Sequence, residues 1–455
     1  MTQNLNSTQE AAVNIKEGPV LVSAPPGSGK SRIIVHRVAR LIESDSDPEK
    51  IMVATFTRKA ATELKERVSK MVGSDLKKMS CGTFHSICLN LLKNFSDRDW
   101  QVITEAKARD AVSIGLAQEC LDVKTRDILL DISYLKAWMI SPYEAMLRAK
   151  TPVEKKLAKV YLNYENILQE NNYLDFDNII IETLRLFNNY KNRKQVQGMF
   201  EHVMVDEYQD VNKLQGVLLS TISEKSKSVF AVGDASQAIY GFMGANLNEF
   251  RTFPTRYSGC KPVFLDLNYR SNKNIVDVSN SLVVGRTSSL MKSFNEDAGE
   301  RIKVCIADSV EDEAYKLGKI IPQLSGITAI LVRAAWQLPP ILSVLDKAKI
   351  RYRVLSDSSR SVEEDAENYG VNVYVLTMHA AKGLEFDNVI VVGLEEDVLP
   401  YKDALDIEEE RRLFYVAMTR AKHNLFIFAC VNRNGRISRL SRFLYELPRN
   451  LIEKI

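Results

Sequence analysis

The stretch PVLVSAPPGSGKSRIIVHRVARLIE, residues 19–43, decides the fold. A short β-branched apolar run leads into a Gly- and Pro-rich turn, and an amphipathic helical pattern follows. A loop of this kind between a strand and a helix predicts a P-loop, because backbone N–H groups at a helix N-terminus close around phosphate oxygens. We expect Lys30 to reach the outer phosphates and the Ser31 hydroxyl to bind Mg²⁺. Ala24 stands where the general pattern has its first glycine, so the prediction depends on the flanking strand and helix.

Similar apolar runs recur on both sides of this stretch and alternate with helical patterns. Uniformly apolar strands that alternate with helices are typical of parallel sheets covered on both faces. The runs form two clusters, which predict two α/β domains. They lie at 19–24, 51–57, 201–207, 228–234 and 263–267 in the first half, and at 328–333, 371–379, 388–393 and 424–430 in the second.

Two segments differ from this alternation. Residues 93–198 are rich in helix formers, as in PVEKKLAKVYLNYENILQENN, and predict a helical insertion in the first domain. Residues 334–370 contain a Pro-Pro pair and the polar run SDSSRSVEEDAEN, and predict a short connection.

Composition restricts the class of protein. The chain has 455 residues, of which 45% are hydrophobic and 26% charged, as expected for two to four soluble globular domains. No apolar run approaches the ~18 residues of a membrane span, and the polar start MTQNLNSTQEAAVN does not resemble a secretory signal. Six scattered cysteines without a CxxC pair predict a reduced, cytoplasmic protein without structural zinc or a membrane partner. The net charge is only +3, so any nucleic-acid site must be a local basic patch.

Two adjacent acids follow the apolar run HVMV. Asp206 and Glu207 stand where a strand is expected to end beside the P-loop. A carboxylate at that position can hold Mg²⁺, and a second can orient and deprotonate an attacking water. Adjacent acids elsewhere are more often a solvated turn, which is the prediction for Glu395-Glu396.

Taken in order, these motifs resemble those of the UvrD/Rep-like (superfamily 1A) DNA helicases. The resemblance extends from residue 5 to residue 422, and eight motifs occur in sequence. They are Leu5-Asn6 with Gln9 (the Q motif), TFTRKAATELKERV (55–68), GTFHS (82–86), VDEYQD (205–210), VGDASQAIYGFMGA (232–245), LNYRS (267–271), TMHAAKGLEFDNVIV (377–391) and EERRLFYVAMTRAK (409–422).

The resemblance implies an ATP site between two RecA-like P-loop NTPase domains. Its catalytic residues would be Lys30, Asp206, Glu207, Gln237, Arg270 and Arg420. Gln9 would read the adenine, Tyr269 would stack on it, and Glu385 would accept from the ribose hydroxyls. Ser31 and Asp206 would hold Mg²⁺. The remaining nucleotide contacts would be Ala24, Pro25, Pro26, Gly27, Ser28, Gly29 and Arg32. Arg270 and Arg420 lie in the second domain, so their charge would make hydrolysis depend on closure of the two domains. The alternative for either arginine is a surface ion pair worth about 0–1 kcal/mol.

A track for single-stranded DNA is also implied. Stacking on aromatic rings combined with phosphate contacts is the chemistry expected of such a track. Phe56, Tyr240 and Phe242 are the stacking candidates. The phosphate or groove candidates are Thr55, Arg58, Thr83, His85, Thr377 and His379.

This chain departs from the family pattern in three places. Met243 stands where an arginine is usual, which removes a cation from the track. Arg58 stands where asparagine is common and can restore part of that charge. The large helical 2B subdomain, which usually precedes TMHAAKG, is essentially absent, since only the connection at 334–370 lies there.

We therefore expect four parts: residues 1–92 and 199–262 as RecA-like domain 1A, 93–198 as a 1B-like insertion, and 263–455 as RecA-like domain 2A. The implied function is an ATP-dependent helicase and translocase on single-stranded DNA, of 3′–5′ polarity, which engages single strands and single/double-strand junctions. A second hypothesis is an ATP-gated protein displacer or loader without processive unwinding. A third, a small-molecule P-loop kinase, leaves Asp206-Glu207, Gln237 and the two arginines unexplained.

Overall fold

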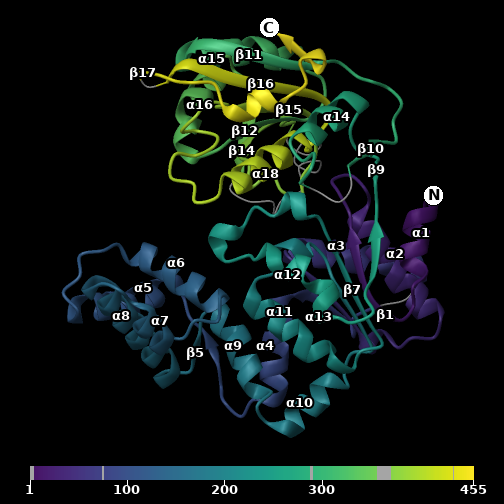
Figure 1. Ribbon diagram of the computed structural model, residues 1–455, viewed down its shortest axis with the longest axis vertical. Coiled ribbons are helices and arrows are strands. Elements are labelled where there is room, and N and C mark those ends of the chain that lie inside the picture. Colours follow the sequence, from purple (N-terminus) through teal and green to yellow (C-terminus); the bar gives the residue numbers. More distant parts are fainter. Residues whose placement is uncertain (1–4, 74–75, 287–289, 356–369, 434) are drawn as a thin grey trace. The chain divides into compact units, whose positions relative to one another are not determined.

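The computed structural model describes residues 5–73, 76–286, 290–355, 370–433 and 435–455. The chain divides into two units, each built on its own large sheet (Figure 1). Unit 1 comprises Met1–Ser23, Lys30–Gly233 and Tyr240–Val263. Unit 2 comprises Ala24–Gly29, Asp234–Ile239 and Phe264–Ile455, so two loops that follow strands of unit 1 are grouped with unit 2.

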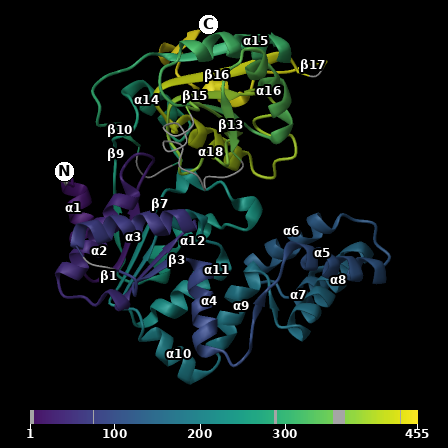
Figure 2. The same ribbon diagram turned by 180° about the vertical axis from the view of Figure 1, so that it is seen from behind.

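The sheet of unit 1 has the strand order β3-β2-β6-β7-β1-β8, and the pairs from β3 to β1 are parallel. In the two opposite views, α2 (Lys30–Glu43) and α3 (Arg58–Val72) cover one face, while α11 (Lys213–Ile222) and α12 (Leu247–Arg251) cover the other (Figures 1 and 2). Its strands are β1 (Gly18–Ser23), β2 (Ile51–Thr55), β3 (Ser80–Thr83), β6 (His202–Val205), β7 (Ser228–Gly233) and β8 (Lys261–Phe264).

Parallel strands bring their carboxyl ends to one edge of the sheet, which is where open α/β sheets place their ligand sites. At that edge β1 leads into the P-loop, β2 into Phe56, β3 into His85, and β6 into Asp206. Four segments that are far apart in the sequence therefore meet at one place.

The predicted helical character of residues 93–198 is confirmed. Its helices are α5 (Glu105–Gln118), α6 (Thr125–Ala137), α7 (Pro142–Arg148), α8 (Pro152–Glu170), α9 (Phe176–Leu186) and α10 (Tyr190–Gln197). The group α5–α8 lies to one side of the unit 1 sheet, and α9 and α10 lie closer to α11 (Figures 1 and 2). A two-stranded pair, β4 (Gln101–Val102) with β5 (Tyr173–Leu174), ties the ends of the α5–α8 group together. The fully buried Lys136 on α6 lies 2.5 Å from Glu165 on α8 and 2.6 Å from Asp175, the N-cap of α9. The charge pairing of that ammonium fixes these three helices to one another, because a buried charge is tolerated only when it is paired.

Unit 2 is built on a second parallel sheet, so the predicted α/β class is confirmed for both halves. The strand order is β13-β14-β12-β15-β16-β11-β18, with β17 (Arg436–Ile437) added antiparallel to β16. Its helices include α14 (Lys273–Ser281), α15 (Val310–Ile320) and α18 (Ile407–Met418). The other strands are β11 (Ile302–Ser309), β12 (Thr328–Val332), β13 (Tyr352–Leu355), β14 (Val373–Thr377), β15 (Phe386–Val392), β16 (Ala421–Arg433) and β18 (Ile452–Lys454).

The structure corrects three expectations. The predicted connection at 334–370 is wrong for its first part, where α16 (Leu338–Lys347) and edge strand β13 belong to unit 2, because Ile341 and Leu345 pack into its core; residues 356–369 lie outside the described range. The single strand expected at 263–267 is divided between β8 and β9 (Leu267–Asn268), which belong to different sheets.

The third correction concerns Glu395-Glu396, which is not a solvated turn. Glu395 is fully buried, where its carboxylate accepts from the Cys430 backbone N–H and from Arg433 at 2.7 Å. Glu396 forms an ion pair with Arg442 at 2.8 Å. Both acids therefore hold the strand ends of unit 2 together.

Within the described residues, no helix is long and apolar enough to cross a membrane.

Candidate functional site

The P-loop lies between β1 and the first residue of α2, Lys30, as the sequence predicts. Gly27 and Gly29 have φ angles of +69° and +87°, a region that a residue with a Cβ rarely adopts. The Ser28 hydroxyl donates to the Pro25 carbonyl at 2.7 Å and closes the turn. Ala24, where the general pattern has glycine, is fully buried, so its methyl group packs inside the protein.

Within unit 2, with which this loop is grouped, Asn268 contacts the loop. The sequence did not single out this residue. Its amide nitrogen donates to the Pro26 carbonyl at 2.9 Å, and the next backbone N–H, of Tyr269, donates to the Gly27 carbonyl at 2.9 Å. A Cβ added to Gly27 would lie 2.8 Å from that amide nitrogen and 2.9 Å from the Cβ of Arg270. The glycine is therefore required by a close approach as well as by its φ angle.

Asp206 directly follows β6 and faces Ser31 in the first turn of α2. Burial, and next the neighbouring Glu207, raise the pKa of this carboxyl to about 7, although Lys30, the Glu207 backbone N–H and Ser31 act in the opposite direction. The Ser31 hydroxyl lies 3.5 Å from the nearer Asp206 oxygen. Two hard oxygen ligands at this separation could hold one Mg²⁺, a cation that keeps waters and phosphate oxygens as its other ligands.

Glu207 has a strained backbone. Its φ of +51° places a non-glycine residue in the left-handed region, a conformation that concentrates at functional sites. Its backbone N–H donates to Asp206 at 2.9 Å, and Gln209 donates to its carboxylate at 2.6 Å. Gln209, fully buried and not predicted as a site residue, therefore fixes the direction of the carboxylate.

Gln237 and Arg420 are in direct contact within unit 2. Arg420 donates to the Gln237 side-chain oxygen at 3.2 Å, and the Gln237 amide donates to Asp234 at 2.8 Å. Lys382 donates to the Gln237 backbone carbonyl at 2.9 Å. Both ends of the Gln237 side chain are thus engaged by hydrogen bonds.

Arg270 pairs with Glu385, the residue expected to accept from the ribose. The guanidinium donates to the Glu385 carboxylate at 2.7 Å and to the Thr419 carbonyl at 3.0 Å. Burial alone would raise the pKa of Glu385, but Arg270 and then Lys422 reverse the effect and hold it below its ordinary value. The carboxylate is therefore ionised and available as an acceptor.

Gln9 lies on α1 (Ser7–Asn14) and is buried. It forms a capping box with Asn6, in which its side-chain oxygen accepts from the Asn6 backbone N–H at 3.0 Å. Arg32, in the first turn of α2, is partly buried. Tyr269 is 38% exposed, and its ring lies 4.7 Å from that of Phe294. The structure thus leaves part of the Tyr269 ring open to a ligand.

The carboxyl edge of unit 1 contains a hollow of about 300 Å³ that we call the acidic hollow. It joins the two predicted catalytic carboxylates to several of the predicted DNA residues. Its lining includes Asp177, Asp206, Glu207 and Asp210, the aromatic residues Phe56, Phe84, Phe176 and Tyr240, and also Thr55, Thr83, His85 and Met243.

Two predicted stacking residues form a pair at this hollow. The rings of Phe56 and Tyr240 stack at 5.1 Å with an angle of 12°, and Phe242 lies 6.2 Å from Tyr240. Phe56 and Phe242 are 47% and 62% exposed. Exposed, clustered aromatic rings are costly in water and typical of surfaces that bind bases.

Phe176 is a further aromatic residue that the motif analysis missed. It is 65% exposed at the first position of α9, and its ring meets the edge of His85 at 5.6 Å. A phenylalanine between two aspartates (Asp175-Phe176-Asp177) is an unusual exposed position, and this local pattern was the available signal. Burial lowers the pKa of His85, so its ring is neutral at pH 7 and acts through ring contact and N–H donation.

The remaining DNA candidates occupy separate places. Arg58 is exposed at the first position of α3. Thr377 and His379 lie at the end of β14 in unit 2, where the Thr377 hydroxyl accepts from the Ala380 N–H at 3.2 Å. Burial, together with the nearby Arg333, lowers the pKa of His379 to about 4, so this histidine is neutral at pH 7.

Comparison with known proteins agrees with this arrangement. Residues 5–258 match the UvrD/REP helicase N-terminal domain, and residues 263–360 and 355–432 match the UvrD-like helicase C-terminal domain. The ATP-dependent DNA helicase PcrA of Staphylococcus aureus (strain Mu50) is 34% identical, and that of Staphylococcus epidermidis (strain RP62A) is 27% identical. Each alignment extends over 637 positions and covers 100% of this chain and 87% of the relative. The chain therefore belongs to the UvrD/REP family of DNA helicases.

Proposed function

We propose that this protein hydrolyses ATP with Mg²⁺ to move along single-stranded DNA in the 3′–5′ direction and to open duplexes at single/double-strand junctions. One observation carries the proposal beyond family membership. Asp206 and Glu207, which would act on the nucleotide, line the same hollow as Phe56 and Tyr240, which would stack on bases. ATP hydrolysis and base binding would thus take place in the same hollow.

For the nucleotide chemistry, we propose that the P-loop backbone and Lys30 bind the phosphates. Ser31 and Asp206 would hold Mg²⁺, which when bound neutralises charge on the phosphate oxygens. Glu207, oriented by Gln209, would accept a proton from the attacking water. Arg270 and Arg420 would supply positive charge to the transferred phosphoryl group.

Coupling to DNA would pass through the segment between Gln237 and Tyr240. Gln237 contacts Arg420, and three positions later Tyr240 stacks on Phe56. A change at Arg420 that accompanies hydrolysis would therefore reach the stacking pair along the chain itself. Only contacts that differ between nucleotide states can drive movement in this way.

The second hypothesis, a displacer or loader without processive unwinding, has one observation in its favour. The alignments extend over 637 positions although this chain has 455 residues, so the relatives contain segments that it lacks. Duplex unwinding from a 3′ tail argues for the motor. Removal of a bound protein from single strands without unwinding argues for the displacer.

We expect single-stranded DNA to stimulate ATP hydrolysis strongly. The measurement is the rate of phosphate release with and without oligothymidylate, with the Lys30→Ala protein as background. An equal rate in both conditions would contradict a DNA motor and favour the kinase hypothesis.

We expect Phe56→Ala to weaken single-strand binding about tenfold, because stacking on one base is worth about 1–3 kcal/mol. Fluorescence anisotropy with labelled oligothymidylate measures this affinity. Tyr190→Ala is a suitable control, since Tyr190 is 77% exposed on α10 and lies outside the acidic hollow. Equal affinity of the Phe56 variant and the control would remove Phe56 from the track.

A further inference from the structure

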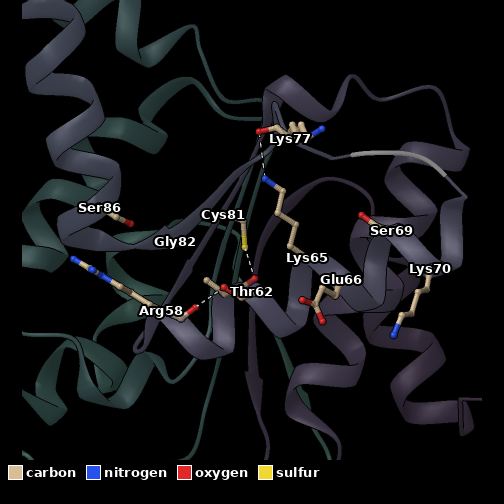
Figure 3. Close-up of a pocket in the computed structure, with 11 residues that line it drawn as sticks. Arg58, Thr62, Lys65, Glu66, Ser69, Lys70, Lys77, Cys81, Gly82 and Ser86 are labelled. Atoms are coloured by element: carbon tan, nitrogen blue, oxygen red, sulfur yellow. Dashed lines mark hydrogen bonds between the residues drawn. The ribbon is translucent and has the colours of Figure 1, made fainter. Parts of the chain in front are cut away.

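A second concave surface of unit 1 lies between α3 and the edge strand β3, and we call it the cationic groove (Figure 3). Its volume is about 700 Å³. Arg58, Lys65 and Lys70 reach it from α3, and Lys77 reaches it from the segment that leads to β3. No aromatic residue lines the groove in the described part of the chain.

Cationic side chains outnumber acidic ones in the lining of this groove. Four cationic side chains face a single carboxylate, that of Glu66. The other acid nearby on α3, Glu63, is paired with Lys59 at 3.8 Å and with Arg67 at 3.9 Å, and does not line the groove. Within the described residues, neither Lys65 nor Lys70 has a carboxylate within ion-pair distance. Lys65 and Lys70, gathered with Arg58 in one concave surface, create a positive field that attracts an anion.

The groove is also partly organised in advance. Lys65 donates to the Lys77 backbone carbonyl at 3.2 Å, which holds its ammonium near the segment before β3. The Thr62 hydroxyl donates to the Arg58 carbonyl at 3.1 Å at the opposite end. Burial raises the pKa of the Cys81 thiol in the wall to about 11, so this side chain adds no negative charge.

The cationic groove and the acidic hollow are lined by neighbouring residues of the same two segments. Phe56 lines the hollow, and Arg58, two positions later, lines the groove. Gly82 and Ser86 line the groove on either side of Thr83 and His85, which line the hollow. A strand bound at Phe56 therefore lies close to Arg58.

The two surfaces have complementary chemistry. The acidic hollow has aromatic rings and four carboxylates, and none of the described residues that line it is a lysine or arginine. Its rings suit bases, but it offers no cationic side chain to the phosphates of a DNA strand. The cationic groove has cations and hydroxyls but no ring, which suits a sugar-phosphate backbone and carries no sequence preference.

We infer that the cationic groove binds the phosphodiester backbone of the single strand beyond the acidic hollow, through Lys65, Lys70 and Lys77. The inference rests on the proposed function, because it extends the same DNA track. It assigns to α3 and to the segment before β3 cationic phosphate contacts, which would add to the uncharged ones predicted in the hollow.

The test compares strand lengths. Lys65→Gln/Lys70→Gln/Lys77→Gln is titrated with oligothymidylates of about 4 to about 16 nucleotides, beside the wild type. The matched control is Lys191→Gln/Lys194→Gln/Lys225→Gln, which removes three exposed lysines of unit 1 that lie outside the groove. Circular dichroism and thermal melting show whether each variant is folded.

We expect the affinity of the groove variant to level off at short oligonucleotides. The affinity of the wild type and of the control should continue to rise on longer ones. On the longest strand the groove variant should bind about tenfold more weakly. Its plot of log K against log salt should be shallower by roughly 2, since each lost phosphate contact on a single strand lowers the slope by about 0.7.

Two results would overturn the inference. One is that the groove variant shows the same length dependence and salt slope as the control. The groove would then bind another anion, such as an acidic peptide. The other is that the groove variant loses the same factor of affinity on the shortest and longest strands. The lysines would then act only through the overall positive potential of the protein. In both cases DNA-stimulated hydrolysis by the wild type would still support the proposed function, whereas its absence would reject the function itself.

Discussion

Glu207→Gln should lower the rate of ATP hydrolysis by about 10²–10⁴-fold, the usual contribution of a positioned general base. The substituted amide keeps the shape of the side chain and can still interact with Gln209, which donates to Glu207 at 2.6 Å. It cannot accept a proton from water at neutral pH. Binding of ATP and of single-stranded DNA should persist, because neither is assigned to the Glu207 carboxylate.

The measurements are steady-state phosphate release, nucleotide affinity by fluorescent analogue, and DNA affinity by anisotropy. Glu201→Gln makes the same substitution just before the other end of β6, where Glu201 pairs with Lys227 at the surface, and should retain full turnover. Near-normal hydrolysis by the Glu207 variant would transfer the base role to another group, and Asp210, which also lines the acidic hollow, would be the next candidate.

Lys30→Ala should reduce turnover by about 10²–10³-fold or more, because it removes a preorganised cation from the charge that develops on the phosphates. It also removes a charge that opposes the rise in the pKa of Asp206. Weaker nucleotide binding should therefore accompany the loss of rate. The fold should survive, since Lys30 is only partly buried at the start of a helix.

Lys273→Ala provides the control for this substitution. Lys273 is also the first residue of a helix, α14, and it pairs with Asp277, one turn further along the same helix. An ion pair of this kind is worth little. Turnover by the Lys30 variant equal to that of the Lys273 variant would reject the P-loop assignment.

Local patterns predicted the parts of the site that are continuous in the chain. The P-loop is recognisable because strand, glycine turn and helix follow one another within 25 residues. Asp206-Glu207 is recognisable because an apolar strand ends directly before it. The α/β class followed from nine apolar runs that alternate with helical patterns.

Partners that are distant in sequence could not be predicted in the same way. Asn268 reaches the P-loop across 242 positions, and nothing in its neighbours indicates that contact. Glu395 was misread because its partner Arg433 is 38 residues away, so the pair of acids resembled a surface turn. Phe176 was missed because its exposure, and its approach to His85, depend on how α9 packs.

The stacked pair of Phe56 and Tyr240 has a consequence for how tightly DNA can be held. With their centres 5.1 Å apart, the two rings leave no room for a base between them, so a base must part the rings or stack on an outer face. Parting them costs about 0.5–1.5 kcal/mol of ring contact, against about 1–3 kcal/mol gained from the base. When a base departs, the rings close on each other and recover that contact, which lowers the barrier to release. Such a pair would bind each base more weakly than two separated rings would, and it would release the base faster.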